Sequence, residues 1–248
     1  MPSIIFSVFY FLLFYEYKGM GNAIYSIING CGHLWYLPML FWCFVGGWLL
    51  GQVKIKDGWK IAFLVLLNLF VVISLPLRLS STISYMVYFY GGFMFYKYSD
   101  RINTFMNCRN LVIAWLVFVL LFAVLRPLRD VLIADASAAR LQKIIFVVGN
   151  HACQLLYAWA GLIAFYGTAV YYTQKHKLSK MTENIAACCF GIYLFQQFVL
   201  QLLYYKTSFP TLVGPYWLPW CGFVIAVVVS FVFSSLLLKT KTGRFLIG

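Results

Sequence analysis

Charged residues are scarce in this sequence. They make up 10% of its 248 residues, whereas 63% are hydrophobic, and the mean hydropathy is +0.86. Soluble domains carry roughly a quarter charged residues, and here long apolar runs recur along the entire chain. The composition therefore excludes a soluble protein. It predicts an all-α, polytopic bundle of membrane helices that forms a single domain over residues 1–248.

Acidic residues are rarer still, and none lies inside an apolar run. The six of them fall in predicted connections or at helix ends: Glu16, Asp57, Asp100, Asp130, Asp135 and Glu183. Ion-coupled transporters usually place ionisable side chains near the middle of the membrane. The absence of an intramembrane carboxylate therefore argues against an ion-coupled transporter.

Several familiar motifs are also missing. The seven cysteines include no Cys-x-x-Cys pair and do not group with the three histidines, so we expect neither a disulfide framework nor a metal site. There is no Gly-rich phosphate loop. The net charge of +13 is expected to follow membrane topology, so we expect no nucleic-acid partner and take the lipid bilayer as the main one.

The apolar segments predict about eight transmembrane helices. They cover residues 4–15, 33–52, 61–75, 83–96, 111–125, 151–173, 185–204 and 217–238. The run 144–172 is too long for one upright helix, so Gly149-Asn150-His151 is expected to interrupt it. Polar connections are expected at 19–32 and 126–143. The first segment starts almost at Met1 and is short, which predicts an N-terminally incomplete chain.

Basic residues set the predicted orientation. Twelve of the 19 fall on one side of this arrangement: Lys54, Lys56, Lys60, Lys97, Arg101, Arg109, Lys175, Lys177, Lys180, Lys239, Lys241 and Arg244. Lys and Arg collect in cytoplasmic loops. This side is therefore predicted to be cytoplasmic, with both termini there and the start of the second segment facing outward.

The start of that second segment carries the first candidate for chemistry, His33. Trp35 and Tyr36 follow it and mark a membrane interface, where amphipathic rings are favoured. An imidazole titrates near neutral pH, so His33 could act as a general base on a hydroxyl at the outer face. Alternatively, His33 bonds a loop carbonyl and orients Trp35.

Cations and amides supply further candidate binding residues. Arg78, Arg126 and Arg129, on the outer side, could hold an anionic glycan or pyrophosphate by forked hydrogen bonds, and anchoring to lipid headgroups explains them equally well. Gln196 and Gln197 lie inside an apolar segment, where amides need partners, and are expected to face the interior of the bundle.

Four stretches together resemble a known family. In chain order they are Gly32-His33-Leu34-Trp35-Tyr36-Leu37-Pro38-Met39-Leu40, the aromatic and basic stretch Tyr90 to Lys97, Phe190-Gly191-Ile192-Tyr193-Leu194-Phe195-Gln196-Gln197, and Lys239-Thr240-Lys241-Thr242-Gly243-Arg244-Phe245-Leu246. This order resembles membrane acyltransferase family 3, whose members O-acylate surface polysaccharides and other extracytoplasmic glycans.

The resemblance implies a membrane O-acyltransferase, most often an O-acetyltransferase, in the cytoplasmic (inner) membrane. It implies acetyl-CoA or another acyl-CoA as donor substrate, no bound cofactor, and a glycan or lipid-linked sugar as acceptor. Catalysis is then expected at His33, and substrate binding at Trp35, Tyr36, Arg78, Arg126, Arg129, Gln196 and Gln197.

The sequence departs from the family pattern before His33. The family carries a catalytic histidine on its first helix and an Arg-x-x-Arg motif ahead of the His-x-Trp segment, and neither stands there in this sequence. The chain therefore resembles the family without its first two helices, and an inactive fragment is one interpretation of this difference. The alternative is a non-catalytic membrane carrier or scaffold for a lipid-linked glycan.

Overall fold

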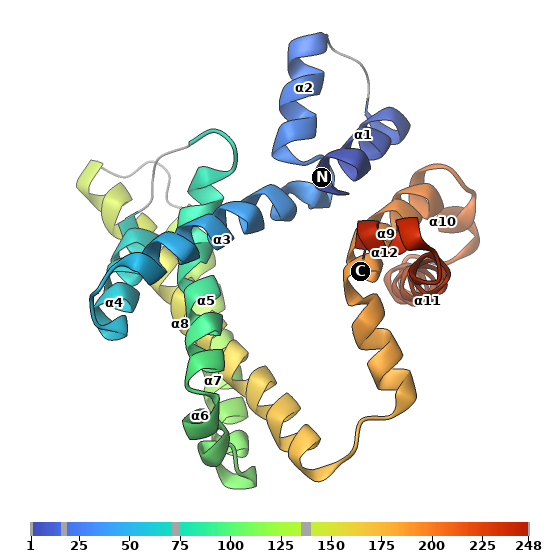
Figure 1. The fold of residues 1–248 in the computed structure, drawn as a ribbon. Helices are drawn as coiled ribbons and strands as arrows, with labels where there is room; N and C mark the ends of the chain where they lie inside the picture. The colour runs from blue at the N-terminus through green and yellow to red at the C-terminus, as the bar shows by residue number, and fades with distance from the viewer. Residues whose placement is uncertain (1, 16–18, 71–74, 135–139, 248) are drawn as a thin grey trace. The chain divides into compact units, whose positions relative to one another are not determined.

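The computed structural model describes residues 2–15, 19–70, 75–134 and 140–247 (Figure 1). Within these ranges all regular structure is helical, which confirms the predicted all-α class. The elements are α1 (Pro2–Phe14), α2 (Met20–Asn29), η1 (Gly32–Trp35), α3 (Tyr36–Gln52), α4 (Asp57–Phe70), α5 (Leu79–Lys97), α6 (Ser99–Phe105), α7 (Cys108–Ala134), α8 (Arg140–Lys175), α9 (Lys180–Tyr205), α10 (Phe209–Leu212), α11 (Leu218–Leu238) and α12 (Lys241–Ile247).

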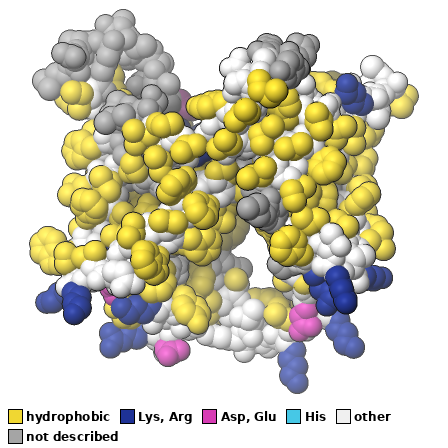
Figure 2. Space-filling model, turned by 45° about the horizontal axis from the view of Figure 1, so that its top comes forward, with side chains coloured by type: hydrophobic (Ala, Val, Ile, Leu, Met, Phe, Trp, Pro, Cys, Tyr) yellow, Lys and Arg dark blue, Asp and Glu magenta, His cyan; other side chains and the backbone are white. Residues whose placement is uncertain are grey.

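Five segments of the described residues are long and apolar enough to cross a membrane. They are Gly32–Gln52, Cys108–Asp130, Ile144–Lys175, Lys180–Tyr205 and Leu218–Leu238. Hydrophobic side chains cover broad areas of the surface, as expected where lipid is the solvent (Figure 2). The other three predicted spans correspond to α1, α4 and α5, so the total of about eight stays a prediction.

The helices group into two compact units. Unit 1 comprises Met1–Pro38 and Leu178–Gly248, and unit 2 comprises Met39–Lys177. Unit 1 holds α1, α2, η1 and α9 to α12, and unit 2 holds most of α3 together with α4 to α8. The prediction of a single domain over 1–248 is not tested by this grouping.

Unit 1 is built on close packing of α9 against α11. Small residues of α11 recur every four positions and are all buried: Gly222, Ala226, Ser230 and Ser234. This spacing places them on one helix face, where they let the neighbouring backbone approach. A Cβ at Gly191 of α9 would overlap the Ser234 side chain. An apolar core joins this pair to α1, with Phe6, Tyr10 and Leu194 among its buried members.

Unit 2 is built on α7, α8 and α5. The Trp115 indole of α7 donates a hydrogen bond of 3.0 Å to the Thr168 hydroxyl of α8. On α5, Gly91 lies directly against the Trp159 ring of α8, where a Cβ would overlap it. Leu77 and Arg78, just before α5, have φ values of 55° and 61°, in the left-handed region. Two consecutive left-handed residues turn the chain sharply into α5.

The predicted polar connection at 126–143 is wrong for most of its length. Helix α7 continues through Pro127 to Ala134, and α8 already begins at Arg140. Pro127 breaks one backbone hydrogen bond, but helices in membrane proteins tolerate proline where neighbouring groups satisfy the freed carbonyl. Arg126 and Arg129 therefore lie on α7, and Arg140 begins α8.

The predicted interruption at Gly149-Asn150-His151 is also wrong, because α8 runs unbroken from Arg140 to Lys175. Its polar side chains find partners on neighbouring helices. Asn150 accepts a hydrogen bond from Arg129, and Nδ1 of His151 lies 3.3 Å from the carbonyl oxygen of Leu69. With these partners, no break in the helix is needed.

Other connections also contain short helices that the sequence pattern did not predict, among them α6 and α10. The Gly-rich stretch 19–32 contains α2, which packs against α1, and the basic end contains α12, which packs against α9 and α11. Helices α2 and α12 gain their stability from packing against longer ones.

Candidate active site

His33 lies in the 3-10 turn η1, directly before α3 and beside α1 and α9. The Tyr193 hydroxyl of α9 donates a 2.6 Å hydrogen bond to the His33 carbonyl oxygen, which ties the turn to α9. Gly32 has a φ of 53°, and a Cβ there would meet the Tyr10 ring at 2.9 Å. Glycine at this position therefore lets the turn approach α1 closely.

Three aromatic rings surround the His33 imidazole. Its centroid lies 5.7 Å from that of Tyr10, 5.4 Å from that of Tyr193 and 6.4 Å from that of Phe198. We call these three residues the aromatic box. Only Tyr193 belongs to a stretch that sequence analysis had singled out. Tyr10 and Phe198 were missed, because nothing in their spacing shows that α1 and α9 meet at His33.

Both ring nitrogens of His33 are buried, and neither has a hydrogen-bond partner of good geometry among the described residues. The alternative role, in which the imidazole bonds a loop carbonyl and orients Trp35, stays a prediction, and the backbone of Tyr193 and Leu194 on α9 also interacts with the imidazole. A buried polar atom left without a partner costs about 1–3 kcal/mol. An imidazole left in this state can gain a hydrogen bond from a hydroxyl group that reaches it.

Trp35 and Tyr36 extend the aromatic surface beyond the box. The Tyr36 ring lies 5.8 Å from that of Tyr193, and the Trp35 ring lies 6.3 Å from that of Tyr36, both edge to face. Edge-to-face pairs of this kind are favourable, and exposed faces of such rings can stack on sugars. The structure thus brings Trp35 and Tyr36 to the same site as His33.

The two glutamines predicted to bind substrate also lie in unit 1. Gln196 and Gln197 are both half-buried on α9. The Gln197 side chain interacts with the Tyr10 hydroxyl, and so does Gln201, one turn later. Gln197 therefore supports the box through Tyr10.

The three predicted arginines lie in unit 2. Arg78 is the N-cap residue of α5. The Arg126 guanidinium lies 5.7 Å from the centroid of the Phe122 ring. Arg129 donates to the Asn150 side chain at 2.5 Å and to the Tyr157 hydroxyl at 3.0 Å. These two bonds orient the planar Arg129 guanidinium against α8.

Unit 2 also contains an electrostatic cluster around Asp57, at the start of α4. Its carboxylate accepts hydrogen bonds from Lys97 at 2.7 Å, from the Tyr98 hydroxyl at 3.0 Å and from the Tyr90 hydroxyl at 3.1 Å. These donors, Lys97 first, hold the pKa of Asp57 below its usual range. Sequence analysis missed the cluster because its members lie on different elements.

Metal chemistry finds no support in the described residues. No three His, Cys, Asp or Glu side chains among them lie close enough together to hold a metal ion. The seven cysteines are all free thiols.

The helices and the surroundings of His33 together indicate a class of protein. Among the described residues, five apolar helices able to span a bilayer identify a multi-pass membrane protein, and the buried His33 imidazole, with no well-formed hydrogen bond there, is a candidate base. Residues 2–239 match acyltransferase family 3, described as an acyltransferase domain. The chain therefore belongs to acyltransferase family 3 and is a membrane acyltransferase. Neither the curated proteins nor the solved structures gave a match.

Proposed function

We propose that this protein is an O-acyltransferase of the inner membrane. It transfers an acyl group, with acetyl the simplest case, from acyl-CoA to a hydroxyl group of an extracytoplasmic glycan or lipid-linked sugar. The observation that carries the proposal is the His33 imidazole. Its two nitrogens are buried beside an aromatic surface and have no hydrogen-bond partner of good geometry among the residues that the structure describes. Because the chain belongs to an acyltransferase family, we assign the imidazole a role as general base in acyl transfer.

In the proposed reaction, His33 acts as a general base. The acceptor hydroxyl oxygen attacks the thioester carbon, the carbon–sulfur bond breaks, and an ester forms. The hydroxyl proton passes to the imidazole and from there to the sulfur, so coenzyme A leaves as its thiol. General-base catalysis of this kind contributes roughly 10²–10⁴-fold to a rate.

Other side chains support the two substrates. Trp35 and Tyr36 would stack on the sugar rings of the acceptor. Within unit 2, Arg129 is oriented by its two hydrogen bonds and stays a predicted binding residue for an anionic group. Exposed lysines at positions expected in the cytoplasm, such as Lys54 and Lys56, would attract the phosphates of coenzyme A.

The proposed topology places both termini in the cytoplasm. It rests on the excess of Lys and Arg in one set of connections. With this orientation, η1 lies towards the outer face, where a glycan acceptor is available. Reporter fusions at the two termini would check the orientation, and a periplasmic signal from either terminus would contradict it.

The test compares His33→Ala with His176→Ala in membranes that carry equal amounts of each variant. His176 is exposed at the end of α8, so its substitution is a matched histidine control. An isotope-labelled acetyl-CoA is supplied, and label in the envelope glycan is measured. We expect His33→Ala to lower transfer by about 10²-fold or more. The control should match the wild type.

The outcomes separate the two functional classes. Transfer that is unchanged in His33→Ala, with the wild type active, removes the role of His33. A wild-type protein that moves no label to glycan, yet is needed for glycan export, favours the non-catalytic carrier instead. Thermal unfolding of each purified variant shows whether lost transfer reflects lost folding.

A further inference from the structure

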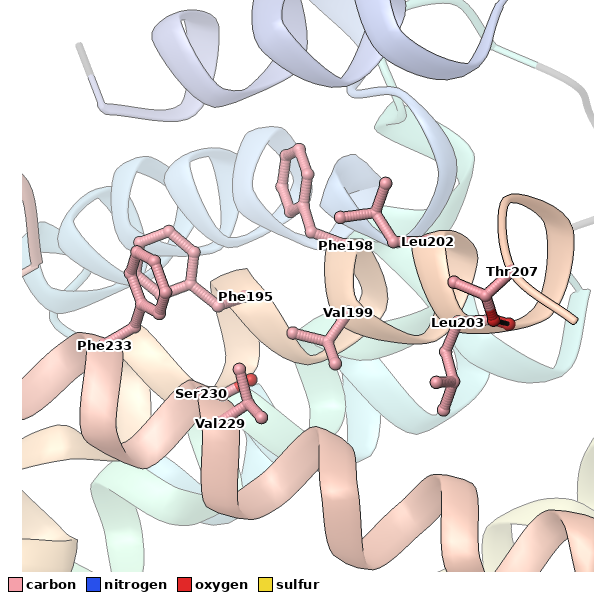
Figure 3. Close-up of a pocket in the computed structure, with 9 residues that line it drawn as sticks. All are labelled: Phe195, Phe198, Val199, Leu202, Leu203, Thr207, Val229, Ser230 and Phe233. Carbon is pink, nitrogen blue, oxygen red and sulfur yellow. Dashed lines mark hydrogen bonds between the residues drawn. The ribbon is translucent and has the colours of Figure 1, made fainter. Parts of the chain in front are cut away.

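A cavity of about 370 Å³ lies between α9 and α11 in unit 1 (Figure 3). We call it the α9–α11 groove. Its wall is almost entirely apolar and includes Phe195, Phe198, Val199, Leu203 and Phe233. Its size is in the range of pockets that hold small ligands, about 300–1,000 Å³. Such a wall offers nothing to a sugar or a phosphate and suits a hydrocarbon chain.

One polar side chain of the groove has no visible partner. The Ser230 side chain is buried, and its Oγ has no hydrogen-bond partner among the described residues. The Ser230 carbonyl instead accepts a bond from the Ser234 hydroxyl. The groove wall is therefore almost entirely apolar, and the Ser230 hydroxyl is buried behind it.

The position of the groove restricts what can enter it. Both α9 and α11 are long and apolar enough to span the bilayer. A groove between such helices is reached through the hydrocarbon layer, where polar solutes are scarce. These surroundings favour a hydrocarbon chain over a polar solute.

The groove also adjoins the candidate active site. Phe198 lines the groove, and its ring meets that of His33 edge to face at 6.4 Å. Phe195 and Phe233 lie at one end of the groove and Leu203 and Thr207 at the other, with the Phe198 ring between them on the upper side of the view (Figure 3). The Phe198 side chain thus contacts both the groove and the His33 imidazole, so an acyl chain in the groove would lie close to His33.

We propose that the α9–α11 groove is the acyl-chain site of the transferase and that it lets the enzyme accept acyl groups longer than acetyl. This inference rests on the proposed function, because it assigns the chain of the acyl donor to the groove while the thioester meets His33. The depth and width of the groove, set by Val199 and Leu203, would limit chain length. In a hydrophobic pocket each methylene changes discrimination by about tenfold or more.

The first experiment compares transfer from octanoyl-CoA with transfer from acetyl-CoA in the wild type and in two variants that fill the groove, Val199→Trp and Leu203→Trp. The matched control is Val228→Trp, on α11 but outside the lining and 55% exposed. We expect the octanoyl-to-acetyl ratio to fall about tenfold or more in each filled variant and to stay at the wild-type value in the control. Equal ratios in all four proteins would overturn the proposal.

A second measurement needs neither variants nor turnover. Octanoyl-CoA with a photoreactive group at the end of its chain is bound to the wild-type protein in lipid nanodiscs, and labelled peptides are mapped. We expect labels on α9 and α11 that unlabelled octanoyl-CoA removes. Labels that an excess of phospholipid removes, but octanoyl-CoA does not, would assign the groove to bulk lipid and overturn the proposal.

The two measurements separate this inference from the function it rests on. A wild type that transfers acetyl but not octanoyl, with no competed label, refutes the acyl-chain site and leaves the transferase standing. A wild type that transfers neither group, but shows competed labels in the groove, supports the acyl-chain site and refutes the proposed transfer.

Discussion

Replacing Gly91 by Ala tests the packing of α5 against α8. A Cβ at Gly91 would overlap the Trp159 ring, whereas a Cβ at the adjacent Gly92 would have no heavy atom within 4 Å. The Trp159 ring cannot move away freely, because the rings of Tyr88 and Phe95 lie 5.9 Å from it. The two substitutions therefore differ in their surroundings and in little else.

The expected magnitudes follow from two opposing effects. Forcing extra atoms into a packed contact costs about 1–3 kcal/mol. Exchanging glycine for alanine inside a helix returns about 0.5–1 kcal/mol. The helix effect is common to both variants and cancels between them. Gly92→Ala should thus be slightly more stable than the wild type, and Gly91→Ala should fall about 1–3 kcal/mol below Gly92→Ala.

Thermal unfolding of the purified proteins in one detergent provides the assay. For a chain of this size, 1 kcal/mol corresponds to about 2–4 °C in Tm. We expect Gly91→Ala to melt at least about 2 °C below Gly92→Ala. Equal melting temperatures for the two variants would show that Gly91 does not pack on Trp159 as described.

Two further substitutions test the polar contacts of unit 2. Asp57→Asn should be less stable than the wild type at neutral pH, and the difference should shrink as the pH falls below about 4, because a carboxylate with a lowered pKa stabilises the fold only while it is ionised. A difference independent of pH, in melting curves taken across that range, would contradict the carboxylate contacts. Arg129→Lys should cost about 1 kcal/mol, since a lysine cannot reproduce both bonds to Asn150 and Tyr157. Adding Asn150→Ala to Arg129→Lys should then cost less than Asn150→Ala alone, and additive losses would count against the network.

The helical framework was predictable from the sequence, because long apolar runs leave lipid-exposed backbone few alternatives to helices. The candidate base was predictable for a related reason. His33 lies beside Trp35 and Tyr36 at the start of an apolar run. A titratable side chain at a membrane interface is a candidate for proton transfer. The residues around it were not predictable, since Tyr10 and Phe198 reach His33 only through tertiary packing.

Helix ends were the least predictable feature. Arg126 and Pro127 resemble the start of a loop, yet α7 continues past both. Polar residues inside α8 resemble a break, yet Asn150 and His151 bond to neighbouring helices. The sequence shows that polar side chains in an apolar segment need hydrogen-bond partners. It does not show which helices supply those partners. The short helices α2 and α12 were not predicted for the same reason, because both depend on packing against longer helices.

The shared position of Phe198 bears on how this enzyme could be inhibited. Phe198 lines an apolar groove, and its ring also meets the buried imidazole of His33 edge to face. A small molecule with a short alkyl tail and a hydrogen-bonding head could therefore occupy both surfaces with one compact scaffold. Because Tyr193 ties the His33 turn to the same helix, the spacing between the two binding points is fixed in advance. Little conformational entropy would then be lost when such a compound binds.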